Sequence, residues 1–119
     1  MPEESRVLDI EALESAIEKR DEEVFQSLAE DLHYADLASV FQDLDDDEAR
    51  SFFTRHINLA SFPQVLAELP DALIEETLER FNETSQREIL RKLIDDDRAD
   101  VLQDVSPEAR QNYIAMLKP

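Results

Sequence analysis

An acidic segment near the C-terminal end of the chain carries the residues most able to do chemistry. From position 95 to position 105 it reads Asp-Asp-Asp-Arg-Ala-Asp-Val-Leu-Gln-Asp-Val. At about 100° per residue, Asp96, Asp97, Asp100 and Asp104 fall within an arc of roughly 100° on a helix, and the apolar residues occupy the other side. Like charges one turn apart destabilise a helix by roughly 0.2–0.5 kcal/mol per pair. The segment therefore either solvates a surface or binds a cation.

Mg²⁺ is the cation that suits such a surface, because it takes carboxylate oxygens and keeps several of its waters. Asp96 and Asp100 lie one turn apart and could hold one hydrated ion. The alternative is that these acids only begin the helix and solvate its face, which is the usual meaning of a run of charge. Spacing alone favours this alternative. The run from Asp45 to Asp47 reads more simply still as the start of a helix, where negative charge is favoured.

Catalytic chemistry is not indicated by any spacing in the chain. His33 and His56 are far apart, and neither lies at the spacing of a metal site or a catalytic triad. We expect His33 to start a helix and His56 to end one near the negative end of its dipole. The serines lack the glycine-flanked turn of a nucleophile elbow. We therefore predict that the protein is not an enzyme and has no catalytic residue.

Composition narrows the class of protein. The 119 residues are 42% hydrophobic, which favours one folded domain over residues 1–119. Thirty acids against twelve bases give a formal charge of −18, which disfavours nucleic acid and anionic membranes as partners. Cysteine is absent, so the chain has no disulfide and no thiolate ligand. It also lacks a signal-peptide core and any apolar run long enough to span a membrane, and we expect a soluble chain.

Glycine is absent as well, and this excludes several kinds of site. A phosphate-binding glycine loop, a dinucleotide-binding fingerprint and the glycine turns of β-hairpins all need it. Helix ends cannot use the usual glycine cap, so Asn, Asp and Pro must separate the helices. An all-helical chain with tight connections is the simplest fold that meets these limits.

Apolar pairs recur about every 12 residues, which suits one short helix followed by a turn. Residues 40–44, followed by Glu-Ala-Arg at 48–50, resemble residues 101–105, followed by Glu-Ala-Arg at 108–110. We predict an all-α fold, a right-handed superhelix of short antiparallel helices, with N-terminal helices in residues 1–27 and a repeat region over 28–119. Such stacks usually act by binding. The pairs are Val40-Phe41, Phe52-Phe53, Val65-Leu66, Thr77-Leu78, Ile89-Leu90, Val101-Leu102 and Tyr113-Ile114.

Single residues mark where these helices should start and which faces they should bury. Ser106 reads as a helix cap followed by proline, and Pro63 must lie in the first turn of its helix. Residues 7–19 and 22–32 read as two further helices at the N-terminal end. Their expected apolar faces are Leu8, Leu13 and Ile17 in the first helix, and Val24, Phe25 and Leu28 in the second.

The acidic segment also carries a family resemblance. Residues 96–102, Asp-Asp-Arg-Ala-Asp-Val-Leu, resemble the Asp-Asp-x-Ala-Asp motif and the apolar residues after it in the cytosolic N-terminal domain of MgtE-family magnesium transporters. Residues 65–70, Val-Leu-Ala-Glu-Leu-Pro, resemble a recurring helix ending of that family, and residues 28–38 resemble its first helix junction. The family commonly has proline where this chain has Tyr34. The resemblance runs from about Leu28 to the C-terminus.

This resemblance implies a function. In the family, the domain precedes a pair of CBS domains, a connecting helix and a dimeric membrane pore on the cytoplasmic side of the cell membrane. Mg²⁺ bridges the N-terminal domain and the CBS domains when it is abundant, and this favours pore closure. The resemblance assigns metal contact to Asp96 and Asp100, with Asp97 as a further candidate. An acid that some relatives use on an earlier helix aligns with Gln64, so that contact is lost or altered here. The resemblance also implies that Mg²⁺ binds weakly to this domain alone.

A metal-independent scaffold for protein interactions is the alternative. The middle domain of flagellar motor switch proteins has a similar helical-repeat build. Its Glu-His-Pro-Gln signature is not reproduced around His33, where the chain reads Leu-His-Tyr-Ala at 32–35. CBS domains and membrane spans encoded after Pro119 would support the transporter interpretation, and their absence would support the scaffold.

Overall fold

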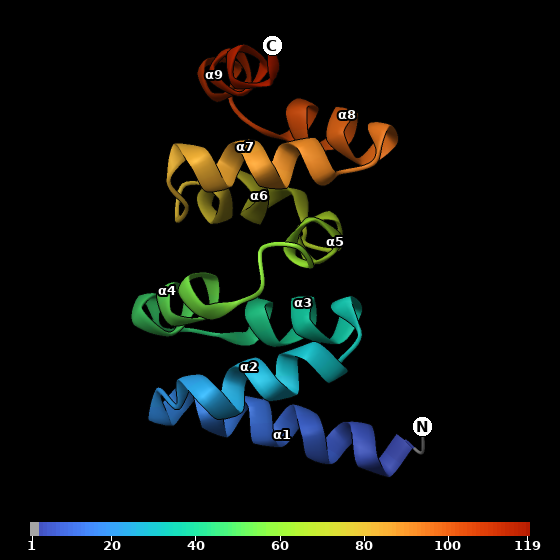
Figure 1. Ribbon diagram of the computed structural model, residues 1–119, viewed down its shortest axis with the longest axis vertical. Coiled ribbons are helices and arrows are strands. Elements are labelled where there is room, and N and C mark those ends of the chain that lie inside the picture. Colours follow the sequence, from blue (N-terminus) through green and yellow to red (C-terminus); the bar gives the residue numbers. More distant parts are fainter. Residues whose placement is uncertain (1–2) are drawn as a thin grey trace. The chain divides into compact units, whose positions relative to one another are not determined.

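Residues 3–119 are described by a computed structural model, and they form nine α-helices and no strand (Figure 1). The prediction of an all-α chain is confirmed. The chain divides into two compact units, Met1–Asn58 and Leu59–Pro119. Our expectation of one domain over residues 1–119 stays a prediction. The helices are α1 Glu3–Lys19, α2 Glu22–Asp31, α3 Tyr34–Asp43, α4 Asp47–His56, α5 Phe62–Ala67, α6 Asp71–Leu78, α7 Glu83–Lys92, α8 Asp95–Asp104 and α9 Pro107–Leu117.

The first unit is built around phenylalanine rings. Phe25 of α2 packs edge-to-face with Phe52 and Phe53 of α4, and its ring centroid lies 5.4 Å from that of Phe52 and 5.3 Å from that of Phe53. Phe41 of α3 lies 5.1 Å from Phe53 in the same edge-to-face arrangement. Such pairs add about 0.5–1.5 kcal/mol each beyond the area that they bury. Helix α1 packs against α2, α3 and α4, so it closes this core.

Two of the expected core residues lie outside the core. Leu13 and Ile17 of α1 are buried, but Leu8 is 64% exposed. Leu8 precedes Leu13 by five positions, which places it about 140° around the helix from the buried face. Val24 is 43% exposed, because it neighbours the buried Phe25 and is turned by about 100° from it. The prediction that Leu8 and Val24 belong to the apolar faces was wrong.

In the second unit, alternate helices pack against one another. Helix α5 contacts α7, α6 contacts α8, and α7 contacts α9, while α8 also contacts α9. The apolar pairs predicted from the 12-residue spacing supply much of the core of this unit, in which α6 and α8 lie side by side. The fully buried residues of this core include Phe62, Val65, Leu66, Leu78, Ile89 and Leu90.

The starts of the helices follow the sequence closely. Asp21, Asp46, Asn82 and Ser106 are N-caps, and each side chain accepts a hydrogen bond from a backbone N–H in the first turn. Pro107 follows Ser106 at the start of α9, as the sequence predicts, and proline also lies in the first turn of α5. These caps satisfy N–H groups that have no partner within the helix.

Both histidines lie at helix ends, as predicted. His33 is the N-cap of α3, and its Nδ1 accepts a hydrogen bond from the N–H of Ala35 at 3.1 Å. His56 is the last residue of α4, with Nδ1 3.5 Å from Oε1 of Glu22. A cationic imidazole suits the end of a helix and not its start.

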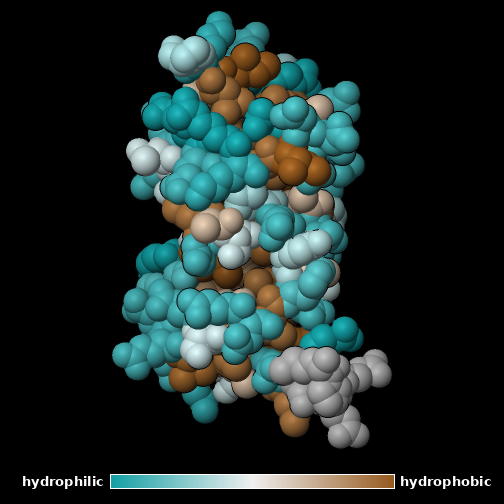
Figure 2. Space-filling view, turned by 45° about the vertical axis from the view of Figure 1, so that its right-hand side comes forward, coloured by the Kyte–Doolittle hydropathy of each residue, from teal (hydrophilic) through white to brown (hydrophobic). Residues whose placement is uncertain are grey.

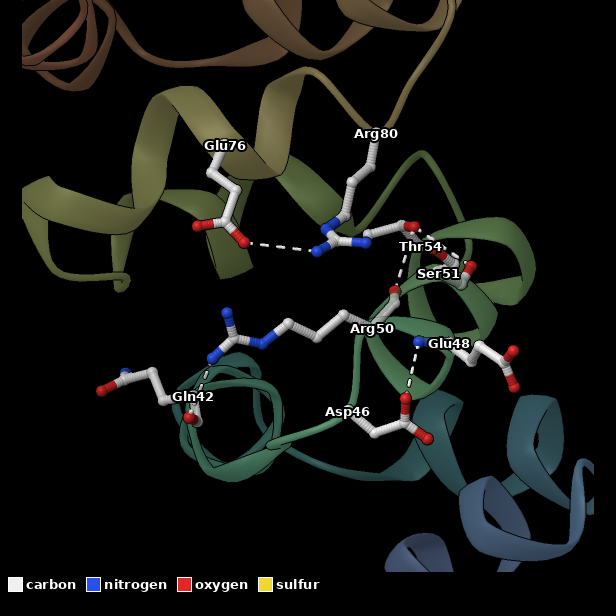
Figure 3. Close-up of polar contacts among 8 residues, drawn as sticks. All are labelled: Gln42, Asp46, Glu48, Arg50, Ser51, Thr54, Glu76 and Arg80. Atoms are coloured by element: carbon white, nitrogen blue, oxygen red, sulfur yellow. Dashed lines mark hydrogen bonds and ion pairs between the residues drawn. The ribbon is translucent and has the colours of Figure 1, made fainter.

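The ends of several helices are held by a contact that substitutes for the missing glycine. Side chains at positions 50, 86, 98 and 110 donate to the backbone carbonyl eight residues earlier. We call this contact the i−8 clamp. Arg50 donates to Gln42, as Figure 3 shows, at a distance of 3.2 Å. The other three pairs are Gln86 to Leu78 at 2.8 Å, Arg98 to Leu90 at 2.8 Å and Arg110 to Leu102 at 2.6 Å.

In the two C-terminal clamps, two nitrogens of the guanidinium group, Nε and Nη2, donate to carbonyls. Arg98 also donates to the carbonyls of Arg91 and Leu93, and Arg110 makes the same two contacts with Gln103 and Val105. The last carbonyls of a helix have no partner within it, so each clamp satisfies groups that a glycine cap would otherwise serve. Positions 86, 98 and 110 are 12 residues apart, and position 50 lies three such steps before 86. The clamp thus follows the spacing of the apolar pairs.

We predict that His33→Asn leaves the free energy of unfolding unchanged or raised near neutral pH, because Asn is a strong N-cap. His33→Ala should lower it by about 0.5–2 kcal/mol, because the N–H of Ala35 then loses its side-chain acceptor. Urea denaturation of the wild type and both variants at one neutral pH measures the difference. Equal stability of His33→Ala and the wild type would contradict the role of His33 as a cap.

Candidate functional site

Helix α8 presents its acids to solvent because its apolar residues face the core. Val101 is only 2% exposed, and α8 packs against α6 and α9. Asp96, Asp100 and Asp104 are exposed, and Asp97 is partly buried. Val101 and Val105 therefore lie on the buried side of the helix as predicted, whereas Ala99, which was expected on the same side, is exposed. Asp95, Asp96 and Asp97 form the acidic first turn, where the helix dipole favours negative charge.

Three acids of α8 share a groove with an acid from another helix. The groove has a volume of about 350 Å³ and includes Asp97, Asp100 and Asp104 of α8 and Asp71, the first residue of α6. We call it the acidic groove. Among the described residues, its lining includes no lysine, arginine or histidine. The remaining lining residues are Ala67, Leu69, Ile74, Val101 and Gln103.

The surroundings of Asp104 in this groove shift its pKa. Partial loss of solvent, the negative charge of Asp71, a hydrogen bond with the Asp71 carboxyl group and the charge of Asp100 together raise the pKa of Asp104 above its ordinary value of 3.8. Asp104 is also the last residue of α8, where the negative end of the helix dipole disfavours a carboxylate. The charged form of Asp104 is therefore destabilised by its surroundings.

The predicted site residues are only partly brought together. Asp97 and Asp100 line the acidic groove, whereas Asp96 is exposed and does not line it. Gln64 of α5 is exposed and does not line it either. The sequence prediction of a site did not include Asp71 or Asp104. Asp104 belongs to the acidic arc of the helix, so a signal for it was present, but Asp71 lies in a segment, Leu69-Pro70-Asp71, that reads only as a turn between helices.

The geometry suits a hydrated cation and not a tightly bound one. Within residues 3–119, no group of three or more His, Asp or Glu side chains is arranged to hold a metal ion directly. Mg²⁺ needs only one or two carboxylates and keeps several waters, so two carboxylates of the groove would suffice as its protein ligands. The acidic groove can therefore lower its own repulsion by attracting a divalent cation, either from water alone or with oxygens from a partner.

The fold is an array of short α-helices, a class that usually acts by binding. A sequence model of the MgtE intracellular N domain matches residues 32–119. The chain therefore belongs to the MgtE intracellular N domain family. This result confirms the resemblance drawn from the residues, and the matched range contains the whole acidic segment.

A solved structure has the same fold. It is a crystal structure of the soluble part of a magnesium transporter, with a TM-score of 0.82 at 14% sequence identity. The match covers 95% of this chain and 44% of the other, so the chain spans less than half the length of that relative. A comparison with curated proteins gave no match. No helix within residues 3–119 is long and apolar enough to cross a membrane.

We predict that Asp104→Asn raises the free energy of unfolding by about 0.2–0.5 kcal/mol at low ionic strength, because it removes one like-charge pair on α8. The raised pKa means that the folded protein holds this proton more tightly than the unfolded chain does. The gain should therefore be present above the folded pKa of Asp104 and disappear as the pH falls below its unfolded value. Added salt should also reduce it.

Asp95→Asn is the matched control, because it changes the same charge at the other end of α8. Asp95 lies at the start of the helix, 3.6 Å from Nη1 of Arg98, so its removal should lower the stability slightly. Denaturation with urea at two salt concentrations measures both variants. A loss of stability in Asp104→Asn at low salt would show that the groove is not repulsive.

Proposed function

We propose that this chain is a cytosolic Mg²⁺-sensing regulatory domain of a magnesium channel or transporter. The observation that carries the proposal is the acidic groove, in which Asp97 and Asp100 face Asp71 and Asp104 with no basic residue between them. Membership of the MgtE intracellular N domain family supports the transporter context. Asp96, Asp97 and Asp100 remain the proposed metal contacts, and the geometry adds Asp71 and Asp104 to them.

The electrostatics of the groove give the ion a reason to bind. Loss of solvent, together with the negative charges of Asp71 and Asp100, destabilises the charged form of Asp104. A divalent cation in the groove would reverse this effect, because a nearby opposite charge favours the carboxylate form. The whole chain adds to the attraction with its formal charge of −18, which raises the local concentration of cations.

The proposed partners lie in the same polypeptide. CBS domains and a membrane domain would follow this chain, and the complete protein would be a homodimer on the cytoplasmic side of the cell membrane. Exposed acids such as Asp96 and Asp100 are available to share a hydrated ion with oxygens of the CBS domains. A site divided between two domains binds weakly when either domain is alone.

Regulation then follows from linkage. An ion that binds the docked arrangement of two domains better than the separated one shifts the equilibrium by its differential affinity. Abundant Mg²⁺ would hold the domains together and favour pore closure, and scarce Mg²⁺ would let their negative surfaces separate. The acidic groove would thus act through repulsion as much as through binding.

We predict that Asp100→Asn in the complete polypeptide raises the Mg²⁺ concentration needed for domain docking about threefold to tenfold, within the usual range of allosteric coupling. Protection from a protease, followed against Mg²⁺ concentration, measures docking, and Mg²⁺ uptake into vesicles measures closure. Asp71→Asn should act in the same direction, since it removes an acid from the same groove.

Asp45→Asn is the control for this experiment. It changes the same charge at an exposed position before α4, in the other unit, and Asp45 is not among the residues that line the groove. Its docking curve should follow the wild type. If the Asp100 and Asp71 variants also follow the wild type, the groove has no part in Mg²⁺ sensing. Domain docking that does not depend on the Mg²⁺ concentration would favour the metal-independent scaffold.

A further inference from the structure

Arg98 lies within the acidic segment but directs its guanidinium away from the acidic groove. Its Nε donates to the carbonyl of Leu90 at 2.8 Å, and its Nη2 donates to the carbonyls of Arg91 and Leu93, each at 3.0 Å. All three acceptors belong to the last turn of α7 and the residue after it. The Arg98 guanidinium is therefore hydrogen-bonded to the backbone at the end of the preceding helix, although Arg98 lies between Asp97 and Asp100 in the sequence.

The carboxylates receive little of this positive charge. Asp95 forms an ion pair with Arg98, at 3.6 Å, and the Asp95 side chain is 97% exposed. Exposed pairs of this kind contribute about 0–1 kcal/mol. Arg98 is absent from the lining of the acidic groove, whereas its neighbour Asp97 is part of that lining. The geometry separates the two opposite charges although they are adjacent in the sequence.

The clamp also fixes the start of α8. Three hydrogen bonds from one planar group hold the first turn of α8 against the end of α7, so the helix cannot turn about its axis without breaking them. On that helix, Asp97, Asp100 and Asp104 face the groove, and α8 packs against α6, which begins with Asp71. The position of the first turn therefore sets how the three acids of α8 face the acid of α6.

We propose that Arg98 is a positioning residue for the acidic groove, which it serves by clamping α8 to the end of α7 while keeping its own charge away from the carboxylates. The inference rests on the proposed function in so far as a cation occupies the groove. Residues that orient metal ligands without touching the metal commonly change metal affinity about 10–100-fold when they are replaced.

The chain offers a matched substitution. Gln86 makes the same i−8 clamp with a neutral amide, since its Nε2 donates to the carbonyl of Leu78 at 2.8 Å. Arg98→Gln should therefore keep the i−8 hydrogen bond to Leu90, while it removes the charge and the hydrogen bonds to Arg91 and Leu93. Arg98→Ala removes all three hydrogen bonds and the charge. A role as a nearby positive charge predicts that both variants bind cations more tightly, whereas a positioning role predicts that they differ.

The first experiment measures the position of α8 without any metal. The chain contains no cysteine, so Ala72→Cys on α6 and Ala99→Cys on α8 give two exposed sites for spin labels. We expect the same narrow distance distribution in the wild-type background and with Arg98→Gln, and a broader or shifted one with Arg98→Ala. Arg50→Ala removes the corresponding clamp in the other unit and should leave this distance unchanged.

The second experiment measures Mg²⁺ binding to the whole 119-residue chain by NMR titration of the amides of α6 and α8. We expect Arg98→Ala to weaken binding about tenfold, the lower end of the range for such residues, and Arg98→Gln to stay within about twofold of the wild type. Arg50→Ala should lower the stability without changing the affinity. If Arg98→Ala does not fold, Arg98→Lys replaces it, because lysine keeps the charge and lacks the planar fork.

The outcomes separate the two proposals. Equal distance distributions in all variants, or equal binding by the Ala and Gln variants, would overturn the positioning role while Mg²⁺ binding by the wild type stood. A distance that changes only in Arg98→Ala, with no Mg²⁺ effect in the wild type or in the complete polypeptide, would confirm the positioning role and overturn Mg²⁺ sensing at this groove. Tighter binding by both variants would assign Arg98 a purely electrostatic effect.

Discussion

The i−8 clamp is the interaction on which the placement of the C-terminal helices depends. The chain has no glycine, and within residues 3–119 only Arg20, just after α1, ends a helix in the left-handed conformation. The carbonyls in the last turns of the other helices still need donors. Arg98 and Arg110 supply three hydrogen bonds each, and Gln86 supplies one from the same position of the repeat. The same side chain therefore ends one helix and sets the start of the next.

The clamp and the acidic groove are two results of one arrangement. Arginine side chains that bond to backbone carbonyls have fewer donors left for the acids beside them. In α8 this leaves Asp97, Asp100 and Asp104 facing Asp71 without a basic neighbour in the groove. The repulsion among these acids is thus a direct consequence of how the helix is held. The proposed cation sensing would use the charge imbalance that the packing creates.

Much of the fold was predictable because it depends on local patterns. The 12-residue spacing of the apolar pairs, the cap at Ser106 and the prolines placed most helices correctly. Leu8 and Val24 were assigned to the core wrongly, because a short apolar face is poorly defined until its partner helices are known. The candidate site was predictable only for the acids on one helix. Asp71 could not be found, since its place in the groove depends on the packing of α6 against α8.

The clamped arginines also change what the formal charge of −18 means for the surrounding solution. Arg50, Arg98 and Arg110 count among the twelve bases, but their side chains are partly withdrawn from solvent and occupied by carbonyls. The neutralising ions for the acidic surface must then come mainly from the solvent, as an atmosphere of mobile cations. Hydrophilic residues cover most of the face shown in Figure 2, where such an atmosphere would gather. The folding equilibrium of this chain is therefore coupled to the ionic composition of its compartment before any specific site is filled.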